Sequence, residues 1–472
     1  MQTEFRLETP QSKNEPCSAS DRKSEVGAAA LGCATVSIRE NSQEDRVTIP
    51  RIEANFERRV YCLFGLVFDA ISIDEAVGVV TEAIVQRKRC HLVTPNMNFL
   101  RLSHSDPSFR DAVLAGDLSA LDGMPLVWMA RALRIGKAQR VSGADMFVAL
   151  NDRSVRPIRA FFFGADEATA RMLRDRLGER RQGLFCVGAY APGFGAVEEM
   201  SSHTALCAVN RRRPDLLSVS IGARKGLTWL CRNERGLTSP VVCNLGVTIH
   251  FAAGTVRRAP PWMRRWGLEW LWRMIAEPRL CGRYATDLLA LARAAAFGVA
   301  PCLAIRALFP PNAKDVAQAK LTEARFDGTT VLRLKGAWCE DNLGPLRAAL
   351  TRVASKPSNL AINVAHVTHV DPAFLGLLMI AYGYQKRTGR RFELYGASLW
   401  LRAILHINGC RFLLSDRDRA AAHRARGPAP LAAKLNGKLR RLTGVSSLFA
   451  MLAKMAGPSH QSQGYGRPSS AN

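Results

Sequence analysis

The sequence lacks the patterns that mark metal sites and disulfide-rich proteins. Its 12 cysteines are scattered singly through 472 residues, with no CxxC pair and no Cys/His cluster at zinc spacing. Neither an HxxE nor an HExxH pattern occurs, so we expect no metal and no cofactor. A chain of this length does not need disulfide bonds to fold, which predicts reduced thiols and a cytoplasmic location.

Nucleotide-binding motifs are absent and acidic residues are outnumbered. Neither GxGxxG nor GxxxxGK[ST] occurs. Lys and Arg total 66 against 40 Asp and Glu, which gives a formal charge of +26 at pH 7. This excess predicts an anionic partner, which could be nucleic acid, acidic lipid or a phosphorylated ligand. No recognised nucleic-acid-binding module accompanies the charge, so we expect no nucleic acid.

Composition and hydrophobic pattern divide the chain into five segments. Residues 1–50 are polar and aperiodic, which predicts a disordered leader. Residues 51–287 alternate short apolar runs with helical patterns, which predicts an α/β domain with a mainly parallel sheet. Residues 288–318 form an apolar, proline-containing linker, and residues 319–416 a smaller α/β module. Residues 417–472 are expected to be a basic, partly disordered tail.

Four apolar runs are the predicted strands of the larger domain: residues 91–94, 159–164, 215–221 and 240–245. Ligands of such sheets bind at the carboxyl ends of the strands.

One uncharged run, residues 294–305, contains Pro301 and is shorter than the roughly 18–20 residues that span a bilayer. It either lies on a membrane surface or covers a core.

Two loop segments carry candidate chemistry. Asp122 stands beside Gly123 at the predicted start of a helix, where a buried carboxylate can accept a proton from a substrate hydroxyl. The alternative is that Asp122 is a helix cap. Arg140 lies close to a glycine turn, which suits binding of a phosphate.

Residues 257–284 interleave Trp with Arg. This composition fits nucleic-acid stacking, a membrane interface, or an amphipathic helix with a buried aromatic stripe.

Several of these segments together resemble the WecG/TagA/CpsF glycosyltransferase family. The matching blocks, which occur in the family's order over residues 61–287, are T-P-N at 94–96, D-G-M-P at 122–125, R-V-S-G-A-D at 140–145, A-G-T-V-R-R-A-P at 253–260, G-L-E-W-L-W-R at 267–273 and E-P-R at 277–279. The resemblance implies an inverting, metal-independent transfer of a sugar from a UDP-sugar to a polyprenyl-diphosphate-linked acceptor. It also implies peripheral association with the anionic inner membrane surface, in the synthesis of bacterial exopolysaccharide or cell-surface polysaccharide.

The resemblance also implies roles for individual residues. Asp122 would be the general base, and Thr94 would lie in the same catalytic pocket. Arg273, Arg279 and Arg283 would belong to a C-terminal appendage that meets lipid diphosphate. The full set of residues implied to bind substrate within the matching region 61–287, apart from the nucleotide-binding segment, is Asn96, Arg140, Gly143, Asp145, Glu269, Arg273, Arg279 and Arg283.

The sequence departs from the family at the nucleotide-binding segment. Gly226 and Leu227 stand where the family commonly has Gln and Glu, and His250 stands in place of an Asp. Either Arg224 and Lys225 hold the donor diphosphate instead, or catalysis has been lost. In the second case the chain would be an inactive transferase-fold regulator or scaffold of polysaccharide assembly.

The segment from residue 319 to residue 414 resembles a STAS domain. The residues that carry the likeness are L-A-I-N-V at 360–364, H-V-D at 369–371, A-F-L-G-L-L at 373–378 and F-E-L-Y-G at 392–396. Anti-sigma-factor antagonists of this family carry a phosphorylatable Ser where this chain has Pro372, so the phospho-switch should be unavailable. The module is expected to contact a protein or sense a ligand, or else to be a stabilising appendage.

Overall fold

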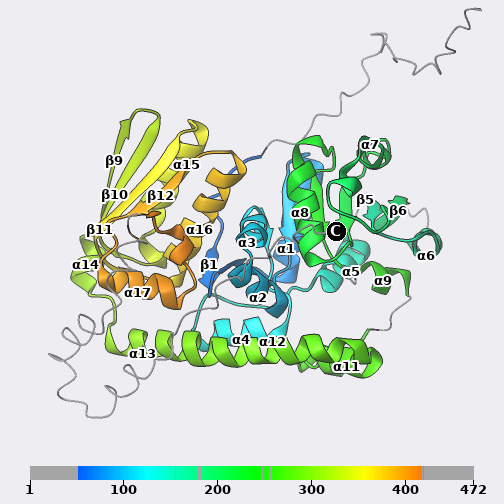
Figure 1. The fold of residues 1–472 in the computed structure, drawn as a ribbon, viewed down its shortest axis with the longest axis horizontal. Coiled ribbons are helices and arrows are strands. Elements are labelled where there is room, and N and C mark those ends of the chain that lie inside the picture. Colours follow the sequence, from blue (N-terminus) through cyan, green and yellow to red (C-terminus); the bar gives the residue numbers. More distant parts are fainter. Residues whose placement is uncertain are drawn as a thin grey trace, which may run out of the picture. The chain divides into compact units, whose positions relative to one another are not determined.

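The computed structural model describes residues 52–154, 156–177, 183–246, 248–254, 258–416 and 418. The predicted leader and, except for Asp418, the predicted basic tail lie outside the described residues. The described chain contains a two-stranded hairpin, a six-stranded sheet and a four-stranded sheet (Figure 1).

The six-stranded sheet is entirely parallel, as the alternating pattern predicts, with strand order β4-β3-β8-β7-β5-β6. Its strands are β3 (Cys90–Val93), β4 (Leu118–Ser119), β5 (Pro157–Phe163), β6 (Gly183–Tyr190), β7 (Leu216–Val219) and β8 (Val241–Asn244). The four predicted strands are confirmed as β3, β5, β7 and β8. Two strands were missed, because β4 has only two residues and Gly188 interrupts the pattern of β6.

Helices connect these strands, and a buried hairpin precedes them. The helices are α1 (Ile73–Val85), α2 (Met97–Ser105), α3 (Pro107–Leu114), α4 (Met124–Ala132), α5 (Gly143–Arg153), α6 (Glu167–Leu177), α7 (His203–Asn210), α8 (Ala223–Asn233) and α9 (Thr248–Ala253). The hairpin pairs β1 (Val60–Leu63) with β2 (Leu66–Asp69), and all of its strand residues are buried.

A helical appendage follows: α10 (Pro261–Arg265), α11 (Glu269–Ala276), α12 (Cys281–Ala294) and α13 (Ala300–Leu308). A π-helical turn, Ala295–Val299, joins α12 to α13 without a break, and Pro301 follows it as the second residue of α13. The helix Pro278–Leu308 is therefore continuous over 31 residues and is long and apolar enough to cross a membrane, by length and composition alone. The uncharged run 294–305 is too short to span a bilayer by itself. The helix that contains it is long enough, because it continues on both sides of that run.

The C-terminal domain has its own mixed sheet, in the order β12-β11-β10-β9. Strands β10, β11 and β12 are parallel, whereas β9 pairs antiparallel with β10. Its elements are α14 (Ala313–Ala317), β9 (Lys320–Phe326), β10 (Thr329–Trp338), α15 (Gly344–Ser355), β11 (Asn359–Val370), α16 (Pro372–Arg387), β12 (Phe392–Tyr395) and α17 (Leu399–Ile407). The predicted α/β character of this module is confirmed, and the second domain has a separate sheet.

Candidate active site

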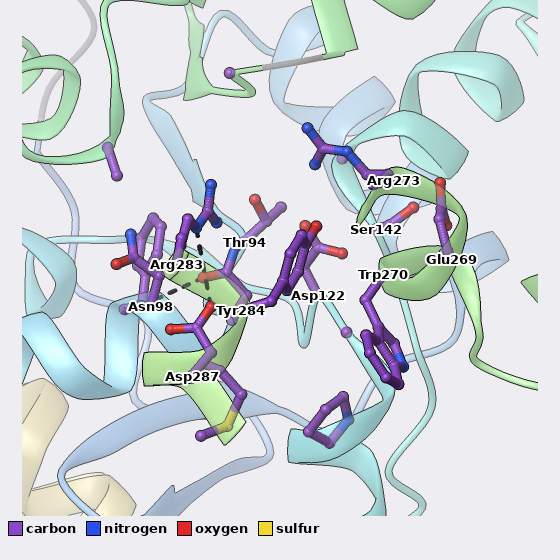
Figure 2. Close-up of a pocket in the computed structure, with 18 of the residues that line it drawn as sticks. Thr94, Asn98, Asp122, Ser142, Glu269, Trp270, Arg273, Arg283, Tyr284 and Asp287 are labelled. Carbon is purple, nitrogen blue, oxygen red and sulfur yellow. Dashed lines mark hydrogen bonds and ion pairs between the residues drawn. The ribbon is translucent and has the colours of Figure 1, made fainter. Parts of the chain in front are cut away.

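A pocket of about 780 Å³ lies where strands β3, β4 and β8 end. The loops that follow these strands line one part of it, and α11 and α12 of the appendage line another (Figure 2). The carboxyl edge of a parallel sheet is where loops converge on a ligand. The sheet therefore sets the place of the pocket, and the appendage completes it.

Thr94 and Asn96 follow β3 directly and both line the pocket. Thr94 is buried, and the Oδ1 atom of Asn96 accepts a hydrogen bond from the backbone N–H of Phe99 at 3.3 Å. Asn96 is thus the N-cap of α2. Asn98, the second residue of the same helix, also lines the pocket and was missed by the sequence interpretation.

Asp122 enters the pocket from the loop after β4, and its backbone N–H donates to the carbonyl of Pro95 at 2.8 Å. The helix-cap alternative is wrong, because the N-cap of α4 is Gly123 and no side chain caps that helix. Burial raises the pKa of Asp122 to about 7, with Arg140 opposing the rise and Glu269 adding to it. A carboxylate with such a pKa is suited to take up a proton near neutral pH.

Arg140 is held by two carboxylates. Its guanidinium lies 2.6 Å from Asp145 and 3.0 Å from Glu269, and Arg258 also reaches Asp145, at 2.8 Å. Burial raises the pKa of Asp145, but Arg140, Ser142 and Arg258 outweigh that effect and leave the pKa below its ordinary value. Arg140 and Glu269 line the pocket, whereas Asp145 supports them from behind. This cluster fastens α11 to the α/β domain.

Gly143, in the first turn of α5, lies on the pocket wall. A β-carbon there would stand 2.7 Å from the side chain of Leu245, so the glycine allows the loop after β8 to pack closely against α5.

The appendage contributes both cationic and polar side chains. Arg273 of α11 and Arg283 of α12 line the pocket, whereas Arg279 does not (Figure 2). Arg273 pairs at 3.7 Å with Glu277, and Arg283 at 3.9 Å with Asp287, in each case one helical turn away. Because both ion pairs are long, an anionic ligand in the pocket could replace Glu277 or Asp287 as the partner of these arginines.

The exposed tryptophans of the appendage exclude one interpretation of the Arg/Trp segment. Trp262 is 59% exposed and Trp266 72%, and α11 has no buried residue. A buried aromatic stripe is therefore wrong. Arg257, the first residue of the segment, lies outside the described residues.

Arg224 and Lys225 lie in the first turn of α8 but do not line the pocket. Arg224 forms an ion pair with Asp106 at 3.0 Å, and Lys225 donates to the carbonyl of Gly195 at 2.8 Å. Only the preceding Gly222 and Ala223 contribute to the pocket wall.

Asn244 occupies the space beside Gly226. Its Nδ2 atom donates to the carbonyls of Gly222, at 3.2 Å, and Ala223, at 3.0 Å. A β-carbon at Gly226 would lie only 2.5 Å from that same amide nitrogen. The Asn244 side chain from β8 therefore fills the space that a side chain at position 226 would need, and it also lines the pocket.

Among the pocket residues of the appendage that were not predicted as site residues are Trp270, Tyr284 and Asp287 (Figure 2). Burial raises the pKa values of Tyr284 and Asp287, and Asp287 is only 8% exposed. The sequence does contain a signal for Asp287: it lies four residues after Arg283, which places the two side chains on one helical face.

Apolar side chains line the remainder of the pocket. They come from α4, α11 and α12, and are Met124, Trp128, Met274, Leu288 and Leu291. Trp128 and Leu288 are also exposed on the surface, so this part of the pocket is continuous with an apolar surface.

Two protein families match separate parts of this chain. The glycosyl transferase WecG/TagA/CpsF family matches residues 61–299, which is 239 of the 472 residues and therefore half of the chain. The Mlab, STAS domain family matches residues 321–414.

Curated relatives of this chain carry one shared name, N-acetylglucosaminyldiphosphoundecaprenol N-acetyl-beta-D-mannosaminyltransferase. The protein from Bacillus spizizenii strain W23 is 24% identical over 199 residues, covering 42% of this chain and 76% of the relative. That from Bacillus subtilis strain 168 is 24% identical, covering 44% and 75%. That from Staphylococcus aureus strain NCTC 8325 is 21% identical, covering 41% and 74%.

Proposed function

Since this chain belongs to the WecG/TagA/CpsF glycosyltransferase family, we propose that it moves a sugar from a UDP-sugar to a polyprenyl-diphosphate-linked saccharide in bacterial cell-surface polysaccharide synthesis. The names of the relatives support this acceptor class. The observation that carries the proposal is the recessed Asp122 carboxylate, which shares one pocket with Arg273, Arg283 and an apolar wall.

The proposed reaction is a single displacement. The acceptor hydroxyl oxygen attacks the anomeric carbon of the donor, the bond from that carbon to the diphosphate breaks, and UDP leaves with the bonding electrons. Asp122 takes the proton of the attacking hydroxyl, which its raised pKa permits. The anomeric configuration inverts because the nucleophile enters on the face opposite the leaving group.

Cationic side chains supply the charge that a metal supplies in other transferases. Arg273 and Arg283 stabilise diphosphate oxygens in the pocket through charge-assisted hydrogen bonds. Arg224 and Lys225 are candidates for the donor diphosphate, because they directly follow pocket residues Gly222 and Ala223 and would need only to exchange their present partners.

The exposed apolar face of the appendage supports peripheral association with the cytoplasmic face of the inner membrane. Trp262, Trp266, Ile275, Leu288 and Leu289 are all more than half exposed. Indole rings favour the headgroup region and leucine side chains the acyl boundary. The acceptor lipid would then reach the apolar wall of the pocket from the bilayer.

Transfer of label from a panel of UDP-sugars to a polyprenyl-diphosphate-linked N-acetylglucosamine tests the proposal. The expected result is turnover with at least one donor, lost in Asp122→Asn. Turnover that survives in Asp122→Asn would remove the general-base role.

The Gly226–Asn244 arrangement also supports a second candidate, an inactive regulator or scaffold that keeps the transferase fold. Binding of donor and acceptor without product, for every donor in the panel, would favour this alternative.

A further inference from the structure

The main helix of the STAS domain is buried on more than one face. Twelve of the 16 residues of α16 are buried, whereas a helix that covers only its own sheet buries a single stripe. The second face of α16 packs against β1 and α3 of the transferase domain, and both domains share one hydrophobic core. The surface of the STAS domain that a separate partner could use along this helix is therefore occupied within the chain.

Two glycines permit this close contact. A β-carbon at Gly376 would lie 2.8 Å from the backbone of Tyr61, and one at Gly383 would collide with the carbonyl of Leu114. The two glycines are seven residues apart and so share one face of α16. This face fits the transferase backbone and has no room for side chains.

Polar contacts surround the glycine face. Arg387, at the last position of α16, donates to Asp117 at 2.6 and 3.2 Å and to Glu234 at 3.0 Å. Its side chain is only 8% exposed. Tyr382 adds a hydrogen bond to Asp111 at 3.1 Å. Removing Arg387 would deprive the Asp117 and Glu234 carboxylates of their ion-pair partner, which is strongly unfavourable in a buried site.

Asp117 links this contact to the strands that carry the catalytic loops. Its carboxylate accepts from the backbone N–H of His91 at 2.9 Å, and its own N–H donates to the carbonyl of His91 at 2.9 Å. His91 lies in β3, which ends at Val93 directly before Thr94, and Asp117 directly precedes β4, which leads to Asp122.

We propose that the partner of the STAS domain is the transferase domain of its own chain, and that Arg387 is a positioning residue for catalysis. Through Asp117 it fixes the start of β3 and β4, and thereby the places of Thr94 and Asp122 at their far ends. The catalytic part of this inference rests on the proposed function.

The test compares Arg387→Ala with Arg402→Ala in the full chain. Arg402 is a matched control, because it is also mostly buried and ion-paired, to Asp418 at 2.6 Å, but it lies within the STAS domain. Arg387→Lys retains the charge and should recover part of the effect.

Two readouts separate positioning from general stability. We expect Arg387→Ala to speed amide hydrogen exchange selectively at residues 91–96 and 117–122, and to lower kcat about 10- to 100-fold with KM changed less than about threefold. Arg402→Ala should do neither. The exchange measurement needs no substrate, so it stands even if transferase turnover is not found.

Unchanged exchange at residues 91–96 and 117–122 in Arg387→Ala would overturn the proposal. Faster exchange spread evenly over both domains would also overturn it, because Arg387 would then contribute only to stability. If Arg387→Ala does not fold, Arg387→Lys keeps the charge but cannot reproduce the paired guanidinium contacts to Asp117, and the selective exchange change is expected there in weaker form.

Discussion

Arg140 Nη1 lies 3.0 Å from Glu269 Oε2, and this ion pair joins the α/β domain to its helical appendage. Both side chains are about one-fifth exposed, so the pair is partly shielded from water. Glu269 belongs to the helix that also carries Arg273. The pair thus holds together the two parts of the chain that form the pocket.

Glu269→Gln should weaken this attachment and also change the acidity of Asp122. Because Glu269 helps to raise the pKa of Asp122, its neutralisation should move the acidic limb of the pH–rate profile to lower pH. We expect kcat/KM to fall about tenfold at pH 8. Glu277→Gln is the matched control: it alters a looser pair at 3.7 Å on the same helix and should leave the limb in place.

Asp122 should give the enzyme an acidic limb near pH 7. A general base works only when deprotonated, so kcat/KM should rise with pH through about 7 and level off above it. Asp122→Asn should lower kcat by roughly 10²- to 10⁴-fold and abolish the limb. A profile that is flat from pH 5 to 9 in the wild type would contradict this assignment.

The same carboxylate should make stability depend on pH. Its folded pKa is raised from 3.8 to about 7, so the folded state binds more protons between these values and stability from this group is lost as pH rises through them. Asp122→Asn removes the penalty of a buried charge. We expect its melting temperature to exceed that of the wild type at pH 8 but not at pH 4.

Gly226→Ala should destabilise the transferase domain. The new β-carbon would press on the Asn244 amide, which holds the carbonyls of Gly222 and Ala223, and this overpacking should cost about 1–3 kcal/mol in the free energy of unfolding. Adding Asn244→Ala should recover part of the loss. Gly282→Ala, a helical glycine with open space around it, should cause no loss, as measured by chemical denaturation.

Membrane association should depend on the exposed appendage. The double variant Trp266→Glu and Leu289→Glu replaces two apolar side chains, 72% and 63% exposed, with charges. We expect co-flotation with anionic vesicles to fall at least tenfold. Phe326→Glu, at an equally exposed apolar position on the STAS sheet, should float as the wild type does. Equal loss in both variants would show that the appendage has no special role.

Local patterns in the sequence were sufficient for much of the fold. Continuous apolar runs predict strands β3, β5, β7 and β8, because a parallel strand covered on both faces needs apolar residues throughout. The two-residue β4 could not be found in this way, although Asp122 follows it. Its position is set by pairing with β3, which is a non-local contact.

The candidate site was foreseen in part. The blocks around Thr94, Asp122 and Arg140 name residues that the structure brings into one pocket. Position in the sequence did not reveal which charges are already paired. Asp145 and Arg224 both form ion pairs and do not line the pocket. Asp287 was missed, because its burial results from the packing of helices and cannot be inferred from the residues next to it in the sequence.

The sequence by itself determined the two α/β domains, the loops that carry Thr94 and Asp122, and the excess of positive charge, since each depends on residue type and spacing. Only the tertiary structure decided that α16 packs on the transferase domain and that Arg387 meets Asp117, 270 positions away in the chain. It also decided the raised pKa of Asp122. These properties arise from burial among distant segments, and the free energy of a charge depends on what surrounds it in space.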